Sequence, residues 1–222
     1  ISARIQLHTR FSKNKKGWFT WIYERLNLRD GMNILEVGCG DGALWKGLNI
    51  PEKISLTLTD ISEGMIRDVR KVFGEDRKYL RLLSCDCQAV PFEDNTFDLV
   101  VANHVLFYCG DVEKACREIY RVLKPGGRVI AATYGKHHME EINRLVLGFD
   151  ERIVLSSQCL YERFGKENGG SILEKMFKEV RWEEYEDSLC VNEPEPLISY
   201  ILSCHGNQNE YIIDCYNEFK DY

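Results

Sequence analysis

Short apolar runs alternate with amphipathic segments through the first two thirds of the chain. Five runs have the length and composition of buried β-strands: 32–37, 54–59, 79–85, 97–102 and 128–133. Three segments between them place apolar side chains at helical spacing: 43–48, 62–73 and 111–123. Strands that alternate with helices predict an α/β fold, with a doubly wound, mostly parallel sheet and helices on both faces.

The flanking segments are predicted to be mostly helical. Residues 15–28 carry an aromatic and apolar stripe of Trp18, Phe19, Ile22 and Leu26. This helix could pack on the sheet, or Trp18, Trp21 and Tyr23 could act as a lid over cofactor and substrate, and the two roles are compatible. Further helices are predicted at 139–149, 153–163, 171–177, 196–204 and 210–219. Residues 180–191 have strand character and predict a sixth strand. With no convincing strand after it, we expect either a missing seventh strand or direct pairing with the run at 128–133.

A glycine-rich loop follows the first apolar run, with the sequence Gly38-Cys39-Gly40-Asp41-Gly42. Glycines let the backbone turn sharply and approach a ligand closely. The loop satisfies the G-x-G-x-x-A pattern of dinucleotide-binding proteins. It also satisfies E-x-G-x-G-x-G, in which Glu36 could meet the ammonium group of S-adenosylmethionine. The loop by itself leaves both ligands open.

Acidic residues end the next two strands. Asp60 follows the second run, where a carboxylate can accept both hydroxyls of a ribose from either ligand. Asp86 follows the third run and precedes a Val90-Pro91-Phe92 turn, where a carboxylate can accept from the adenine amine. Carboxyl ends of parallel strands are the usual ligand edge of such sheets.

In order and spacing these motifs resemble those of class I S-adenosylmethionine-dependent methyltransferases. The matching segments are Leu35–Gly42, Asp60–Met65, Asp86–Phe92, Phe97–Val100 and Leu123–Gly127, within residues 31 to about 135. Val90 stands where the family usually has leucine. The resemblance implies a Rossmann-like fold, S-adenosyl-L-methionine as cofactor and methyl transfer as activity.

The resemblance also implies residue roles. Its cofactor-binding residues would be Glu36, Gly38, Cys39, Gly40, Asp60, Ile61, Met65, Asp86, Cys87, Asn103 and His104. Glu36 and Gly38 would hold the methionine end and Asp60 the ribose, while Asp86 and the Cys87 amide would contact the adenine edge. His104 is the one catalytic candidate, either as a general base or as a pocket-lining residue.

The chain is then expected to form a single methyltransferase domain over residues 1–222. Its parts would be an N-terminal helical lid at 1–30, a cofactor-binding core at 31–135, a helical cap insertion at 136–172 and the C-terminal part of the fold at 173–222. The apolar, partly aromatic cap indicates a small organic acceptor. In-line methyl transfer needs mainly alignment and exclusion of water.

The net charge of the chain bears on which classes of molecule it acts on. The chain carries −6 at pH 7, which argues against a protein that coats nucleic acid. The segment Asn103-His104-Val105-Leu106 also differs from the N-P-P-Y pattern of relatives that methylate base or glutamine amide nitrogens. A small-molecule substrate is therefore the main hypothesis. The alternatives are a methyltransferase acting on RNA or protein, which a basic first 30 residues would support, and a dehydrogenase or non-catalytic nucleotide-binding module.

The cysteines and the hydropathy of the chain give an expectation about the cellular compartment of the protein. Nine cysteines without a C-x-x-C pair predict reduced thiols in a cytoplasmic protein and no metal site. No apolar run approaches 18 residues, so we expect no membrane span. The first residue is Ile1 rather than methionine, which fits a shortened chain. The methylated atom and the oligomeric state stay open.

Overall fold

The computed structural model describes residues 2–48, 50–51, 53–74, 78–156 and 158–222. The chain forms two compact units. The sheet unit comprises Trp18–Lys136 and Leu160–Glu183, and the helical unit comprises Ile1–Gly17, His137–Cys159 and Glu184–Tyr222. Both the lid expected at 1–30 and the cap expected at 136–172 are divided between these units.

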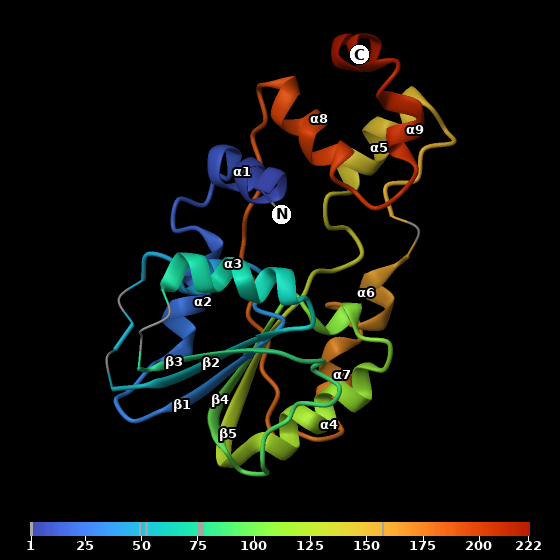
Figure 1. Cartoon of the computed structure of the whole chain (residues 1–222). Helices are drawn as coiled ribbons and strands as arrows, with labels where there is room; N and C mark the ends of the chain where they lie inside the picture. The colour runs from blue at the N-terminus through green and yellow to red at the C-terminus, as the bar shows by residue number, and fades with distance from the viewer. Residues whose placement is uncertain (1, 49, 52, 75–77, 157) are drawn as a thin grey trace. The chain divides into compact units, whose positions relative to one another are not determined.

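A five-stranded, all-parallel sheet forms the centre of the sheet unit (Figure 1), in the order β3-β2-β1-β4-β5. The strands are β1 Asn33–Val37, β2 Ser55–Asp60, β3 Leu80–Ser84, β4 Phe97–Asn103 and β5 Leu123–Ala132. All five predicted strands are confirmed. β5 begins earlier than predicted because Leu123 pairs with Phe97 before the register shifts and Arg128 pairs with Leu99.

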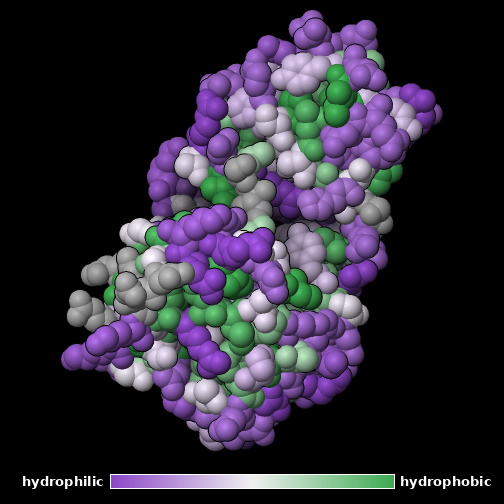
Figure 2. Space-filling model, in the orientation of Figure 1, coloured by the Kyte–Doolittle hydropathy of each residue, from purple (hydrophilic) through white to green (hydrophobic). Residues whose placement is uncertain are grey.

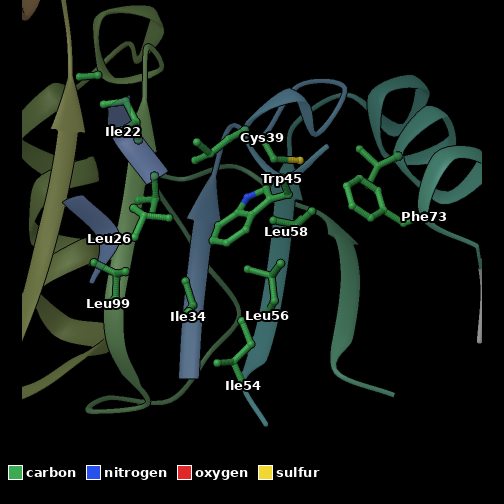
Figure 3. Packing of buried hydrophobic residues seen from close by; sticks show 14 of the residues in the cluster. Ile22, Leu26, Ile34, Cys39, Trp45, Ile54, Leu56, Leu58, Phe73 and Leu99 are labelled. Atoms are coloured by element: carbon green, nitrogen blue, oxygen red, sulfur yellow. The ribbon is translucent and has the colours of Figure 1, made fainter. Parts of the chain in front are cut away.

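Helices cover both faces of the sheet, as predicted. Alternate side chains of each strand point to opposite faces, so Ile34 of β1 joins one core cluster and Leu35 the other. The first cluster packs against α2 Trp18–Leu26 and α3 Glu63–Phe73 (Figure 3). The second packs against α4 Val112–Val122 and α7 Gly169–Glu174, close to α6 Leu160–Arg163.

Local capping agrees with the sequence at α3. The Ser62 hydroxyl accepts a hydrogen bond from the Met65 amide at 3.4 Å, as an N-cap residue does.

The helix predicted at 43–48 is wrong in type. That segment forms only a short 3-10 turn, η1 Ala43–Trp45, because Lys46 is extended and Gly47 has φ of 70°. A second 3-10 turn, η2 Leu106–Tyr108, was not predicted.

The helical unit consists of α1 Ser2–Phe11, α5 Glu140–Phe149, α8 Pro194–Leu202, α9 Gln208–Ile212 and α10 Tyr216–Asp221. Its core is mainly aliphatic: Ile142, Val146, Ile153, Ile198, Ile201, Ile212 and Phe219. The predicted C-terminal helices are confirmed, the last as two short pieces. Of the helix predicted at 153–163 only α6 forms, and Ser157 lies outside the described residues.

The sixth strand predicted at 180–191 is wrong. The described residues after β5 contain no further strand of the sheet, and the segment makes one isolated antiparallel bridge, between Ser12 and Leu189. Its alternating pattern is dominated by acidic residues, and Trp182 is 49% exposed. The expected pairing of this segment with the fifth strand is wrong, since β5 pairs only with β4 in the described part of the chain. The expected lack of a seventh strand agrees with the structure, in which the described residues after position 191 form helices and no strand of the sheet.

The face shown in Figure 2 is mostly hydrophilic, with apolar side chains in smaller areas. Most large apolar residues are instead buried in the three core clusters. In the part of the chain that the structure describes, no helix combines the length and apolar character needed to cross a bilayer.

Candidate functional site

The glycine loop lies at the carboxyl end of β1, in the middle of the parallel sheet. Gly38, Gly40 and Gly42 all have left-handed backbone angles, with φ of 65°, 56° and 74°. A Cβ at Gly38 would lie 2.2 Å from Cγ2 of Val105, so this glycine is needed for packing. A Cβ at Gly40 would meet no atom within 4 Å. The loop therefore packs on the protein at Gly38 and faces open space at Gly40, as a ligand cradle does.

Asp60 fastens this loop to the end of β2. Its Oδ2 accepts a hydrogen bond from the Gly40 amide at 2.9 Å, and its Oδ1 accepts from the Ser62 amide at 2.8 Å. A further backbone bond, from Cys39 N to Thr59 O at 2.9 Å, joins the same two segments. Each carboxylate oxygen can accept more than one hydrogen bond, so Asp60 can also receive two hydroxyl donors.

Glu36 lies beneath the loop and is only 2% exposed. Its Oε2 accepts a hydrogen bond of 2.6 Å from the indole Nε1 of Trp45. Burial raises the pKa of Glu36 to about 8, although the Trp45 bond opposes this rise and Asp60 and Asp41 add to it. Among the described residues, Trp45 is the donor to this side chain, which leaves Oε1 for a donor from a ligand. The Trp45 partner was not predicted.

Asp86 follows β3 and is oriented by a neighbour. The Gln88 amide donates to Asp86 Oδ1 at 2.8 Å, and Gln88 Nε2 lies 3.1 Å from both carboxylate oxygens. Gln88 Oε1 in turn accepts from the Asp111 amide, at 2.8 Å, at the start of α4. The sequence predicted Asp86 but not the glutamine that holds it.

The ends of β2 and β3 lie together, because Cys85 N donates to Asp60 O at 3.0 Å. Two of the predicted apolar contacts follow β2: Ile61 is 73% exposed, and Met65 is half-buried in the first turn of α3. The Cys39 side chain packs in the core, so this residue contributes to the loop through its backbone. Exposed apolar surface beside two carboxylates suits a ligand with a flat base and hydroxyls.

Asn103 and His104 end β4 beside α2. Trp18 donates from Nε1 to Asn103 Oδ1 at 3.3 Å, and its ring centroid lies 5.0 Å from that of His104. His104 has a left-handed backbone, with φ of 55°, and its amide donates to Ala132 O at 3.2 Å. Trp18 also stacks on Trp21, at 5.6 Å between centroids. α2 thus reaches the end of β4 through Trp18.

The fold therefore brings the predicted residues to one edge of the sheet, at the carboxyl ends of β1, β2, β3 and β4. Among the described residues, no group of three or more His, Cys, Asp or Glu side chains is placed to hold a metal ion. A glycine loop after one strand, with carboxylates after the next two strands, is typical of α/β domains that bind nucleotides.

Residues 35–131 match the family model described as a methyltransferase domain. The sheet unit has the Rossmann-like fold of class I S-adenosylmethionine-dependent methyltransferases, and the matched residues are similar to the domain of that family. The match comprises β1 to β5 almost entirely and includes the glycine loop, Asp60, Asp86 and Asn103.

Two curated proteins show the relationship at the sequence level. A sterol 4-C-methyltransferase of Caenorhabditis elegans is 33% identical over 110 residues, which cover 49% of this chain and 33% of the relative. A ubiquinone/menaquinone biosynthesis C-methyltransferase of Escherichia coli is 30% identical over 135 residues, which cover 57% of this chain and 52% of the relative. The match thus spans between a third and about half of these relatives.

Solved structures show the same fold. A SAM-dependent methyltransferase from Aquifex aeolicus has a TM-score of 0.56 and 20% identity, covering 79% of this chain and 86% of its own. A putative methyltransferase of Haloferax volcanii, solved with the Trm112 activator, has a TM-score of 0.56 and 21% identity, covering 78% of this chain and 71% of that one.

Proposed function

We propose that this protein is an S-adenosylmethionine-dependent methyltransferase that methylates a carbon atom of a small organic molecule. The observation that carries the proposal is the Asp60 carboxylate, which bridges the glycine loop and the start of α3 beside open space at Gly40. Both curated relatives are named as C-methyltransferases, one acting on a sterol and one in quinone biosynthesis. These names support a carbon acceptor in a small apolar molecule over RNA or protein.

Each strand end would hold one part of the cofactor. Glu36 would meet the methionine ammonium group through Oε1, and the Gly38–Gly40 backbone would lie along the methionine and ribose. Asp60 would accept the two ribose hydroxyls. Asp86 and the Cys87 amide would contact the adenine edge, with Ile61 and Met65 against its faces. Together these groups would meet the ammonium group, the two ribose hydroxyls and the adenine of the cofactor.

The bound cofactor supplies a methyl group already activated on a sulfonium. This chain's residues would then align the acceptor and exclude water. His104 lies among aromatic rings, with Trp18 at 5.0 Å and Phe107 at 6.1 Å between centroids. Phe107 in turn lies 5.0 Å from Tyr134. In this proposal these rings would form an apolar wall for a flat or unsaturated acceptor, and the His104 imidazole would accept the proton that a methylated ring carbon loses.

Methyl transfer from S-adenosylmethionine labelled in its methyl group tests the proposal. The acceptor panel should contain sterols, quinols with a free ring carbon, total RNA and denatured protein. We expect label in a small apolar acceptor, resistant to the mild acid and base that cleave methyl esters. Asp60→Ala should lower the rate of labelling, because it weakens cofactor binding. Label confined to RNA or protein, or label in the Asp60→Ala variant at the native rate, would contradict the proposal.

A further inference from the structure

Two cysteines from different segments meet beside the adenine end of the proposed site. Cys87 follows Asp86 in the turn after β3, and Cys109 directly follows η2. Their sulfur atoms lie 3.2 Å apart. Cys87 is half-buried, whereas Cys109 is 5% exposed, so the pair is reached from the Cys87 side. A sulfur–sulfur bond is about 2.05 Å long, so a shift of about 1 Å would join the two.

The pair is also chemically asymmetric. The hydrogen bond from the Cys87 thiol holds the pKa of Cys109 below its ordinary value, because it stabilises the Cys109 thiolate. The same contact, together with burial, raises the pKa of Cys87. Cys109 is then the better nucleophile, and Cys87 is the thiol that reacts second, with the oxidised Cys109.

We propose that Cys87 and Cys109 form a reversible disulfide with a peroxide as oxidant, and that this disulfide weakens cofactor binding. In the first step the Cys109 thiolate attacks one oxygen of the peroxide and the O–O bond breaks. The products are a sulfenic acid and hydroxide, which takes up a proton and leaves as water. Cys87 sulfur then attacks the sulfenic sulfur. The S–S bond forms, the S–O bond breaks, and the hydroxyl leaves with the Cys87 proton as water.

The disulfide would change the site because both segments are part of it. The Cys87 amide is the proposed contact to the adenine edge, and Asp86 precedes it directly. On the other side, the segment that ends at Cys109 carries Val105, whose side chain packs on Gly38 of the loop. A bond between the two sulfurs would move the turn that contains Asp86 and Cys87 relative to the glycine loop. Loss of one well-placed hydrogen bond would weaken binding about tenfold. This second part of the inference depends on the proposed function.

Peptide mapping tests the disulfide without reference to activity. The purified chain is treated with hydrogen peroxide, its free thiols are blocked with N-ethylmaleimide, and it is cut before aspartate residues. Cleavage before Asp86, Asp94, Asp98 and Asp111 places Cys85, Cys87 and Cys109 in three different peptides. We expect peptides 86–93 and 98–110 to appear joined, and to separate after treatment with dithiothreitol. Cys85→Ser is the matched control and should keep the joined product, whereas Cys87→Ser and Cys109→Ser should lose it.

Affinity for S-adenosylhomocysteine is then measured on the reduced, oxidised and re-reduced chain. We expect about tenfold weaker binding after oxidation, full recovery with dithiothreitol, and no effect of peroxide on the affinity of Cys109→Ser. Maleimide on both cysteines after peroxide treatment would overturn the disulfide. A joined product with unchanged affinity would overturn its effect on binding. If the reduced chain does not bind S-adenosylhomocysteine, the proposed function fails, and peptide mapping still decides the disulfide by itself.

Discussion

Glu36→Gln should make the sheet unit more stable at neutral and alkaline pH. The native carboxyl is 2% exposed, and burial raises its pKa to about 8 from an ordinary value of 4.5. At a pH between these two pKa values, the folded chain therefore keeps a proton on Glu36 that the unfolded chain has released. The contribution of Glu36 to folding stability is greatest below pH 4.5 and falls as pH rises, by about 1.4 kcal/mol per pH unit, until the folded-state pKa is reached. Glutamine removes this loss and can still accept the hydrogen bond from Trp45.

The difference in unfolding free energy between variant and wild type should thus grow by roughly 3 kcal/mol from pH 5 to pH 8. Urea unfolding followed by tryptophan fluorescence measures it, because every tryptophan of the chain lies in the sheet unit: Trp18, Trp21, Trp45 and Trp182. Glu174→Gln removes an exposed carboxyl of the same unit and serves as control. A Glu36→Gln difference that stays constant across this range would show that folding does not raise the pKa of Glu36. If Glu36 also meets the ammonium group, the stabilised variant should bind S-adenosylhomocysteine more weakly.

Three further substitutions test other contacts of the site. Asp60→Ala should weaken S-adenosylhomocysteine binding by about 2–3 kcal/mol in calorimetry, because a charge-assisted pair of hydrogen bonds is lost; unchanged affinity would place the ribose elsewhere. Trp18→Phe keeps a ring but not the donor to Asn103, so kcat should fall about fivefold with little change in cofactor affinity; the opposite pattern would contradict a role at the acceptor end. Gly38→Ala should destabilise the chain by at least about 1 kcal/mol more than Gly40→Ala in urea, because only the first meets a side chain at 2.2 Å; equal losses would show that backbone strain alone matters.

The core of the sheet unit could be predicted because its signals are local. Strands buried on both faces appear as short apolar runs, and Ser62 fits the start of α3 by residue type and position. The site residues that end strands, such as Asp60 and Asp86, follow from the topology, since parallel strands end at one edge. Their placement at that edge required no knowledge of side-chain partners.

Long-range partners could not be predicted in the same way. Trp45 donates a hydrogen bond to Glu36 across the glycine loop, and Trp18 donates one to Asn103, which lies 85 positions away in the sequence. Neither pairing leaves a spacing pattern, because it depends on how the folded loop and α2 are placed. The strand predicted at 180–191 was wrong for a related reason. An alternating pattern shows that a segment could form a strand with two different faces, but a strand also needs a neighbouring strand with which to pair.

We propose above all that the loop after β1 and the carboxylate after β2 hold S-adenosylmethionine. Calorimetric titration of the chain with S-adenosylhomocysteine, and in parallel with NAD, tests it most directly, since the glycine pattern taken alone fits both ligands. We predict saturable binding of S-adenosylhomocysteine at a single site and no heat of binding for NAD. Binding of NAD, or no binding of S-adenosylhomocysteine by the folded chain, would show that this site does not hold S-adenosylmethionine.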